Sequence, residues 1–348
     1  MNFNKSRHGV ELHLHLDGGS RPATIFKYAK QKNILVPGND AVEFESSLIV
    51  KQPNSLGSFL KTFDYLLPPI VGDAEAITQV TLDFLEDCVN KGGLGYVEPR
   101  FSPHFFAGNG LSVDEATKTV LSALERGSEM FDIQCRAILC MMRHCPKWSD
   151  EVVSLAMKYQ PHGVVAVDVA GDDKPCDGTN TDALIKSAFQ KAHKNGLHCI
   201  AHAGENGCAA SVTEAVYEMY SERIGHGYHI LEDATIYSDT KTKNIHFEVC
   251  PLSSRLTGSV TCDWTKHPVH YFLRDNINFS FSTDDPTVTG QWLLAEKKML
   301  TTEVGVTHEQ IQQANLRAAN ACFLKADEKE DLLNHLRTKG GSGSISSN

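Results

Sequence analysis

"VELHLHLDGG", residues 10–19, places polar side chains in a stretch that otherwise has the valine and leucine content of a buried strand. Because side chains alternate along a strand, His13, His15 and Asp17 project from one face and the leucines between them from the other. Such a face indicates histidines satisfied within a core, a half-exposed edge strand, or a site where chemistry takes place. The choice depends on what the rest of the chain brings to this face.

The composition is that of a globular protein with a sizeable core. Of the 348 residues, 41% are hydrophobic and 22% are charged, which is ordinary for a folded domain, and single α/β barrels reach this length. We expect one domain over residues 1–338 and a Gly/Ser-rich tail at 339–348, either disordered or left by cloning. The net charge of -10 argues against affinity for nucleic acid or anionic membranes and fits a small neutral or cationic partner.

Cysteine usage and the absence of apolar segments bear on the location of the protein. The ten cysteines include no CxxC pair, and several lie in apolar strand-like runs where cysteine packs as a small hydrophobe. The first strand follows the N-terminus without an apolar leader, and no run approaches the roughly 20 apolar residues of a membrane span. We therefore expect a soluble protein of the reducing cytoplasm.

Short runs rich in valine, isoleucine and leucine alternate with stretches of helical periodicity. Eight strands are expected, at residues 10–16, 95–102, 133–141, 163–171, 197–204, 223–230, 244–251 and 276–285. Some helices between them carry end signals, such as the capping box of Ser112 and Glu115 and the glycine at position 196 after a basic last turn. Eight such units favour a closed (β/α)8 TIM barrel, with a doubly wound open sheet as the alternative.

An insertion interrupts this alternation after the first strand. It contains a helix at 21–33 and then the segment SLGSFLKTFDYLLPP at 55–69. The apolar positions of that segment at i, i+3, i+4 and i+7 are Leu56, Phe59, Leu60 and Phe63. A stripe of this kind is commonly part of a core. Because it is inserted where the first strand delivers its polar residues, we expect an inserted apolar helical lid.

Polar residues gather at the C-terminal ends of the expected strands. Besides those of the first strand, they are His202, Glu205, His226, Glu248, Asp284 and Asp285. In a (β/α)8 barrel all these ends meet on one face, where barrel enzymes have their active sites. Three histidines and one carboxylate suit a divalent ion such as zinc, and an H-x-H pair on a strand offers two of the nitrogens.

The residues beside such a metal site have expected roles. Glu205, three positions after His202, is the best candidate for a general acid or base that is not a ligand. His226 lies between two glycines and could orient or deprotonate the water on the metal. Glu248 is expected to support a neighbouring histidine or arginine rather than to act directly. Asp285 precedes a proline and could instead be a turn or helix-cap residue.

Six motifs occur in a specific order along the chain: VELHLHLDG, VDVAGDD, HAGE, ERIGHGYHILED, HFEVCPLSS and STDDP. Together they resemble the adenosine deaminase family, and the similarity extends from residue 9 to residue 336. The resemblance implies a (β/α)8 barrel with one Zn²⁺ per chain that acts on a small purine nucleoside. We expect the chain to be a monomer. The implied reaction removes the 6-amino group of adenosine and 2′-deoxyadenosine by hydrolysis, giving inosine or 2′-deoxyinosine and ammonia, in purine salvage and catabolism.

The resemblance also implies a role for each matched residue. The zinc ligands would be His13, His15, His202 and Asp284. Glu205 would protonate purine N1, His226 would act on the water at the zinc, and Asp285 would contact N7. The further substrate contacts would come from the Gly171 backbone to N3, from Asp17 to the ribose 5′-hydroxyl, from His15, and from the lid residues Leu56, Phe59, Leu60 and Phe63.

Three other functions are weighed against this one. A deaminase of N6-modified AMP uses a similar barrel, but Asp17 should repel a phosphate that carries a charge of about -1.5 to -2. A cytidine-deaminase-like enzyme needs H-x-E followed by P-C-x-x-C, and the chain has His246-Phe-Glu248 without the second motif. A non-catalytic nucleoside-binding protein would be expected to have lost ligands or the acid.

The chain departs from the vertebrate members of the family after FSPH. There it runs FFAGNG into the helix cap at Ser112, where those relatives have a longer loop with a tryptophan near the substrate. The substrate range is therefore open on this side. Pro99, inside the second expected strand, cannot donate a ladder hydrogen bond and predicts a bulge.

Overall fold

Eight parallel strands form the central sheet of the protein. The computed structural model describes residues 3–4, 6–173 and 181–340 of the chain. The eight strands are β1 (Gly9–His15), β2 (Leu94–Phe101), β4 (Ala137–Met142), β5 (Val164–Ala170), β6 (His198–Ala203), β7 (Arg223–His226), β8 (His246–Val249) and β9 (Phe279–Phe281). Each is hydrogen-bonded to the next in this order, and the short strand β3 (Gln134–Cys135) also pairs with β2. Every one overlaps a strand that the sequence predicts.

The sheet closes between β1 and the residues that follow β9. Leu14 forms a parallel bridge with Asp284. The N–H of His15 donates to the carbonyl oxygen of Asp284 at 2.9 Å, and the N–H of Asp284 donates to the carbonyl oxygen of His13 at 3.1 Å. The closed (β/α)8 barrel is confirmed, and the open doubly wound sheet is excluded.

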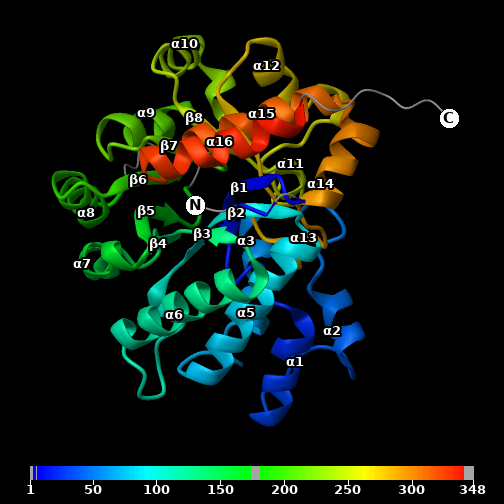
Figure 1. Ribbon diagram of the computed structural model, residues 1–348, viewed down its shortest axis with the longest axis vertical. Coiled ribbons are helices and arrows are strands. Elements are labelled where there is room, and N and C mark those ends of the chain that lie inside the picture. The colour runs from blue at the N-terminus through cyan, green and yellow to red at the C-terminus, as the bar shows by residue number, and fades with distance from the viewer. Residues whose placement is uncertain (1–2, 5, 174–180, 341–348) are drawn as a thin grey trace.

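Helices follow the strands and surround the barrel, as Figure 1 shows. Those that alternate with the strands are α5 (Ala74–Asn90), α6 (Val113–Phe131), α7 (Ser149–Tyr159), α8 (Ala183–Lys194), α9 (Ala209–Tyr217), α10 (Ala234–Thr242) and α12 (Val269–Arg274). Ser112 and Glu115 form the predicted capping box of α6. Gly196, after α8, has a φ of +74°, which favours glycine at a helix C-terminus.

The insertion after β1 consists of short helices. They are α1 (Pro22–Gln31), α2 (Ala41–Leu48), α3 (Leu56–Leu60) and α4 (Phe63–Leu66). The sequence predicts α1 and the lid segment, which forms α3 and α4, but carries no prediction for α2. The remaining helices are α11 (Pro251–Leu256), α13 (Pro286–Thr289), α14 (Leu293–Met299), α15 (His308–Ala321) and α16 (Ala326–Gly340). Short 3-10 or π segments are η1 (Pro103–Phe105), η2 (Pro146–Trp148), η3 (Gln160–His162), η4 (Tyr228–Glu232), η5 (Trp264–Lys266) and η6 (Leu300–Val304).

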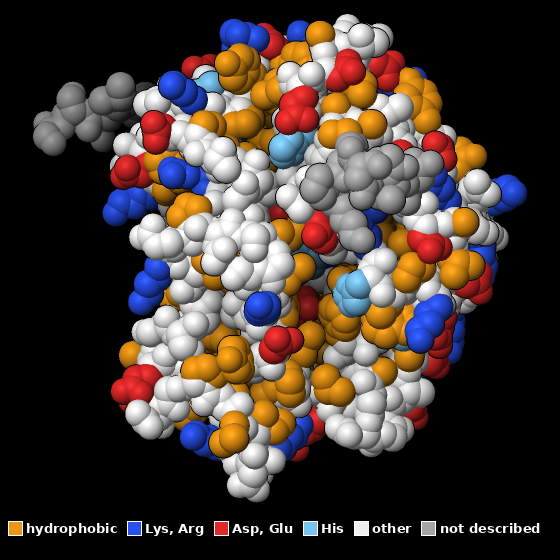
Figure 2. All heavy atoms as spheres, turned by 180° about the vertical axis from the view of Figure 1, so that it is seen from behind, with side chains coloured by type: hydrophobic (Ala, Val, Ile, Leu, Met, Phe, Trp, Pro, Cys, Tyr) orange, Lys and Arg blue, Asp and Glu red, His pale blue; other side chains and the backbone are white. Residues whose placement is uncertain are grey.

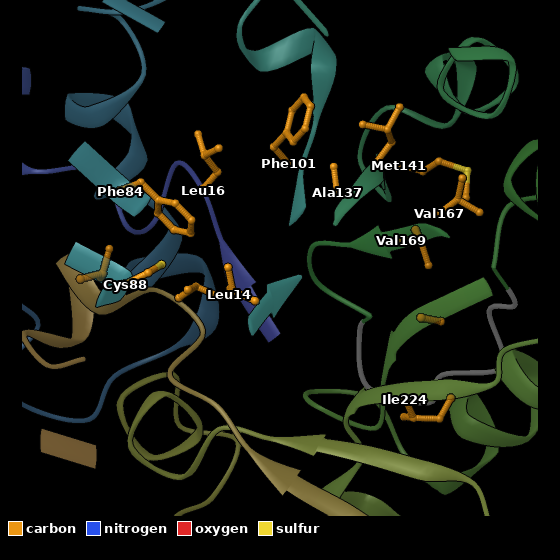
Figure 3. Close-up of a cluster of buried hydrophobic side chains, with 14 of the residues drawn as sticks. Leu14, Leu16, Phe84, Cys88, Phe101, Ala137, Met141, Val167, Val169 and Ile224 are labelled. Atoms are coloured by element: carbon orange, nitrogen blue, oxygen red, sulfur yellow. The ribbon is translucent and has the colours of Figure 1, made fainter. Parts of the chain in front are cut away.

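The two faces of β1 separate core from site. Leu14 and Leu16 are fully buried in a cluster that includes Phe84 of α5, and Figure 3 shows these side chains with others from the strands around the barrel. The histidines of β1 project from the opposite face, into the barrel, because side chains alternate. The strand ends that carry them open onto the face in Figure 2, which is hollowed near its centre.

A register shift lies beside the proline of β2. Glu11 pairs with Val97, but Leu14 pairs with Pro99, so β1 has one more residue than β2 between these two pairs. Pro99 lies in a strand that pairs on both sides, where its missing N–H leaves a gap in the ladder. The predicted bulge is confirmed, with the extra residue in β1.

Three further findings concern the ends, the cysteines and membranes. Helix α16 includes residues 339 and 340, which the sequence assigns to the tail; residues 341–348 of that tail lie outside the described residues. Eight of the described cysteines are free, whereas Cys208 is disulfide-bonded, so the expectation of reduced thiols is wrong for Cys208. None of the helices in the described ranges combines the length and apolar character of a membrane span.

His267 provides a test of how burial of a neutral histidine makes stability depend on pH. It is fully buried, its Nδ1 accepts from the N–H of Val269 at 3.2 Å, and burial, with nearby His270 and Arg255, lowers its pKa from 6.5 to about 3. The folded chain keeps the His267 ring neutral. As the pH falls below 6.5, the unfolded chain therefore binds a proton at this histidine that the folded chain does not bind. This group's stabilisation is therefore present above pH 6.5 and is lost toward pH 3.

We expect the wild-type chain to lose up to about 1.4 kcal/mol more unfolding free energy per pH unit than His267→Asn between pH 6 and pH 4. Asparagine retains an acceptor for an N–H two residues on but does not titrate. Denaturant unfolding of both proteins at each pH measures the difference. Parallel losses in the two proteins would contradict the prediction.

Candidate active site and metal centre

Four predicted ligands converge at the C-terminal end of the barrel. One nitrogen or oxygen from each of His13, His15, His202 and Asp284 lies within 4.8 Å of those of the other three. Asp284 Oδ1 is 3.2 Å from His13 Nε2 and 3.4 Å from His15 Nε2, and the Nε2 atoms of His15 and His202 are 3.2 Å apart. Apart from the partly exposed His15, these residues are buried. Residues 271 positions apart in sequence thus meet around one point.

The outer nitrogens of two of these rings are fixed by carboxylates. His13 Nδ1 lies 2.8 Å from Glu248 Oε2, and His202 Nδ1 lies 3.0 Å from Asp168 Oδ2. A carboxylate at Nδ1 holds the proton there and leaves the lone pair of Nε2 for a metal. His13 Nε2 is buried, and no described residue gives it a hydrogen bond. Nitrogen and carboxylate donors in this number fit a zinc-type ion.

The supporting carboxylates are held by buried arginines inside the barrel. Arg100, which is fully buried, donates to Asp168 Oδ2 at 2.8 Å and to Glu248 Oε2 at 2.6 Å. Arg223 Nε lies 2.7 Å from Glu248 Oε1. Burial by itself would raise the pKa of Glu248, but the two arginines hold it well below its usual range. The supporting role that the sequence gives Glu248 matches this geometry.

Arg100, Asp168 and Arg223 are functional-site residues that the sequence analysis misses. Each is a charged residue in a largely apolar strand, within GYVEPRFS, GVVAVDVAG and RIGHGYHI respectively, and GYVEPRFS also contains Glu98. A buried charge is costly unless it is paired. Charged residues at interior positions of adjacent predicted strands were therefore a usable signal.

A second group of acids lies beside the four ligands. Glu205 is buried, with Oε2 at 3.6 Å from His226 Nε2. Burial raises the pKa of Glu205 well above its usual range, and the charges of Asp284 and Asp173 add to this effect. Burial also lowers the pKa of His226 well below 6.5. Burial therefore favours the protonated form of Glu205 and the neutral form of His226.

Backbone strain accompanies two of these residues. His226 and Asp284 have φ values of +63° and +67°, in the left-handed region that non-glycine residues rarely adopt. At His226 the strand β7 ends, and the chain turns through Gly227 into η4. This turn ends the strand four residues before the predicted boundary and leaves the imidazole at the strand end.

Asp17 and Asp285 aim unpaired oxygens at the same space. Both are buried, and neither Oδ1 atom has a hydrogen-bond partner among the described residues. Burial raises the pKa of Asp17 to about 6 and that of Asp285 well above its usual range. A Cβ on Gly18 would lie 1.7 Å from Asp285 Oδ1, so only glycine permits this approach. Unsatisfied buried acceptors of this kind are costly without a ligand.

A cavity of about 830 Å³ joins these groups to the lid. Figure 2 shows its opening, with acidic and histidine side chains around it. Of the predicted site residues, those that line the cavity are His15, Asp17, Leu56, Phe59, Leu60, Phe63, Gly171, His202, Glu205, His226, Asp284 and Asp285. His13 lies beneath them in the four-residue cluster. The structure brings all the predicted site residues together.

Aromatic side chains line the cavity beside the short loop that follows FSPH. Phe105 and His144 line the cavity, with ring centroids 6.2 Å apart in a stacked arrangement. Trp148 packs edge-on against Phe105 at 6.2 Å but does not belong to the described lining. Phe105, from the short loop, and His144, which follows β4, thus form this side of the cavity.

Three histidines and a carboxylate at the C-terminal end of a (β/α)8 barrel, beside a buried acid, define a metal-dependent hydrolase of the barrel class. The adenosine deaminase family model matches residues 9–339. The chain therefore belongs to the adenosine deaminase family. The resemblance read from the sequence motifs is confirmed.

Curated relatives match over nearly the whole chain. Adenosine deaminase of Bos taurus is 42% identical over 346 residues, covering 96% of this chain and 94% of that protein. Adenosine deaminase of Xenopus tropicalis is 41% identical over 345 residues, with 95% and 94% covered. The chain is thus similar to these enzymes along its full barrel.

Solved structures share the fold at lower identity. Adenine deaminase from Arthrobacter aurescens superposes with a TM-score of 0.85 at 23% identity, covering 95% of this chain and 98% of that one. The Arabidopsis N6-mAMP deaminase gives 0.80 at 24% identity, with 96% and 98% covered. An amidohydrolase from Burkholderia ambifaria, with bound Zn, gives 0.81 at 18% identity, with 96% and 94% covered. These likenesses establish the barrel fold.

Proposed function

We propose that this chain deaminates adenosine and 2′-deoxyadenosine in the cavity at the end of the barrel, with one Zn²⁺ held by His13, His15, His202 and Asp284. The single observation that carries the proposal is the convergence of these four donors within 4.8 Å beside the buried Glu205. Family membership supports the reaction: hydrolysis gives inosine or 2′-deoxyinosine and ammonia. A role in purine salvage and catabolism is general to this chemistry.

The donor set supports zinc as the ion. Imidazole and carboxylate are ordinary zinc ligands, and carboxylate contacts at Nδ1 orient two of the rings. The buried Nε2 of His13, which has no hydrogen bond from the described residues, is an atom that a metal would satisfy. When bound, zinc supplies Lewis-acid activation of water near neutral pH.

Glu205 serves as the acid at purine N1. Carbon C6 of adenine is a poor electrophile until N1 gains a proton. The raised pKa of Glu205, caused first by burial, keeps its carboxyl protonated at the pH where the attacking water is active. Donation from Oε2 to N1 draws electron density from C6 and prepares it for attack.

His226 serves as the base for the attacking water. Its lowered pKa keeps the ring neutral, and its Nε2 lies between Glu205 and Asp284, at 3.6 Å and 3.8 Å from their oxygens. Nε2 accepts one proton from the water as the oxygen bonds to C6, and the amino group leaves with that proton as ammonia. The second water proton passes from the oxygen on C6 to the Glu205 carboxylate, so the oxygen becomes the 6-oxo group, N1 keeps its proton and the acid is restored.

The remaining residues hold the nucleoside. Protonated Asp285 donates to N7, and Gly171 offers its backbone N–H to N3 from a loop with a φ of +98° at that glycine. Asp17 holds the ribose 5′-hydroxyl, with His15 beside it. The apolar side chains of Leu56, Phe59, Leu60 and Phe63 cover the site and exclude water.

A deaminase of N6-modified AMP is the second candidate, since one structural neighbour is the Arabidopsis N6-mAMP deaminase. The charge of the cavity disfavours it. Nine acidic residues belong to the described lining, with Arg143 as the one lysine or arginine. Arg143 already donates to the carbonyl oxygen of His202 at 2.7 Å. A phosphate monoester would enter this acidic space with little compensation.

The assay compares adenosine, AMP and N6-methyl-AMP by their absorbance change, with metal-replete protein and with chelator-treated protein. We expect the metal-replete protein to turn over adenosine but not AMP or N6-methyl-AMP. Chelator is expected to abolish this activity, and added zinc to restore it. Turnover of N6-methyl-AMP in preference to adenosine would replace the proposed substrate. Full activity of metal-free protein would overturn the proposed metal centre.

A cytoplasmic monomer with a single domain over residues 1–338 completes the proposal. One chain supplies every proposed site residue, from the strands, the loops after them and the lid helices α3 and α4, which supports both the monomer and the single domain. Eight of the nine described cysteines are free, which supports a reducing compartment, whereas Cys208 is disulfide-bonded. Light scattering after size exclusion tests the monomer, and cell fractionation tests the location.

A further inference from the structure

The loop that carries Glu205 is held by a carboxylate from the preceding β5–α8 connection. Asp173 Oδ1 accepts from the N–H groups of Asn206 at 2.9 Å and Gly207 at 2.7 Å, and Oδ2 accepts from the N–H of Glu205 at 3.3 Å. Three consecutive N–H groups therefore converge on one side chain. Such concave sets of N–H groups bind anions, and here the chain itself supplies the anion.

This loop has little other regular support. Residues 204–208 belong to no helix or strand, and Gly204 has a φ of +63°. Within the described ranges, the acceptors for the N–H groups of residues 205–207 are the two oxygens of Asp173. The loop begins and ends its turn at glycines, whose backbone has the greatest freedom. The Asn206 side chain also donates to Asp172 Oδ1 at 2.8 Å, and the Gly204 N–H donates to Ser211 Oγ at 2.8 Å. The charge-assisted hydrogen bonds that Asp173 accepts are therefore the contacts that fix the backbone of residues 205–207.

A second set of contacts holds the β5–α8 connection. Beyond residues 174–180, the Thr181 N–H donates to both carboxylate oxygens of Glu214 on α9 at 3.1 Å, and Lys186 of α8 pairs with Glu214. Asp173 itself follows Gly171 by two residues. The backbone that faces the substrate at Gly171 and the backbone that carries the acid are thus joined through short contacts.

We propose that Asp173 is a positioning residue for Glu205, fixing the acid relative to purine N1 through the backbone of residues 205–207. The inference rests on the proposed function, because it assigns to Glu205 the proton at N1. A general acid must lie within hydrogen-bond reach of the atom that it protonates. Loss of the Asp173 contacts releases the acid from that position while the four metal donors and the lid remain in place.

The kinetic test uses Asp173→Ala and Asp173→Glu, with Asp233→Asn as the matched control. Asp233 also accepts two backbone N–H groups, from Thr235 at 2.8 Å and Ile236 at 3.1 Å, but does not line the cavity. We expect Asp173→Ala to lower kcat for adenosine by about 10- to 100-fold with KM within about threefold, since small displacements of catalytic groups have effects of this size. Asp173→Glu is expected to restore part of kcat, and Asp233→Asn to leave both constants unchanged.

A double-mutant cycle separates positioning from general damage. If Asp173 acts through Glu205, adding Asp173→Ala to Glu205→Gln lowers kcat no further. A multiplicative loss in the double variant, or a rise in KM without a fall in kcat, would overturn the inference. Failure of Asp173→Glu to recover any activity would also count against it.

Hydrogen exchange tests the loop without any substrate. The amides of residues 205–207 are expected to exchange faster in Asp173→Ala than in the wild-type chain or in Asp233→Asn. Unchanged exchange would overturn the inference. If the wild-type chain fails to turn over adenosine, the proposed function fails, and this measurement still decides whether Asp173 holds the loop.

Discussion

Glu205→Gln is expected to lower kcat for adenosine by roughly 10²- to 10⁴-fold, the contribution of a well-placed general acid. Glutamine keeps the shape and hydrogen-bonding ability of a protonated glutamate but cannot release a proton to N1. Because burial already keeps the carboxyl neutral, the substitution removes little charge from the folded chain. We therefore expect the folded structure and the metal content to be retained.

Steady-state kinetics and metal analysis of the purified variant measure this effect. The matched control is Glu232→Gln, since Glu232 is an exposed glutamate that pairs with His229 at 2.8 Å and is absent from the cavity lining. The control is expected to retain full activity. Equal turnover by Glu205→Gln and the wild-type chain would remove Glu205 from the proposed role.

The largest expected loss of stability comes from Arg100→Met. Methionine fills much of the volume of the arginine side chain but leaves the buried carboxylates of Asp168 and Glu248 without their shared partner. Removing one member of a buried ion network typically lowers the free energy of unfolding by about 3–5 kcal/mol. The orientation of His13 and His202 depends on the same two carboxylates, so metal affinity is expected to fall by about 10- to 100-fold as well.

Denaturant unfolding and metal titration of the variant test both parts. Arg274→Met is the control, because Arg274 pairs with Asp275 at the surface, where ion pairs contribute little. The control is expected to match the wild-type chain in both measurements. A fully stable Arg100→Met variant with unchanged metal affinity would show that the buried arginine is dispensable.

The first strand shows why so much of the site can be read from the sequence. Alternation of side chains places His13 and His15 on the face opposite the leucines, and closure of the barrel brings every strand end to one rim. His202, His226 and Asp284 are therefore gathered by topology, without any detail of side-chain packing. The capping box at Ser112 is equally predictable because its contacts are local.

The features that the sequence does not predict depend on non-local contacts. Helix α2 is eight residues long, too short for a distinct periodic pattern. Arg100 and Asp168 are ordinary single residues until the barrel places them in contact. Asp173 has backbone N–H groups as partners, and these leave no trace in residue type. Strand β7 ends at His226 because the backbone there enters the left-handed region, which propensity alone does not foresee.

The junction between β1 and the residues after β9, where the barrel closes, has a consequence for biosynthesis. Two of the proposed metal donors, His13 and Asp284, come from opposite ends of the chain and lie on the two edges that meet there. A nascent chain that has not yet released its last strand from the ribosome lacks one side of this junction. The full set of four donors is therefore assembled late, and an ion held by them would oppose opening of the barrel at this junction.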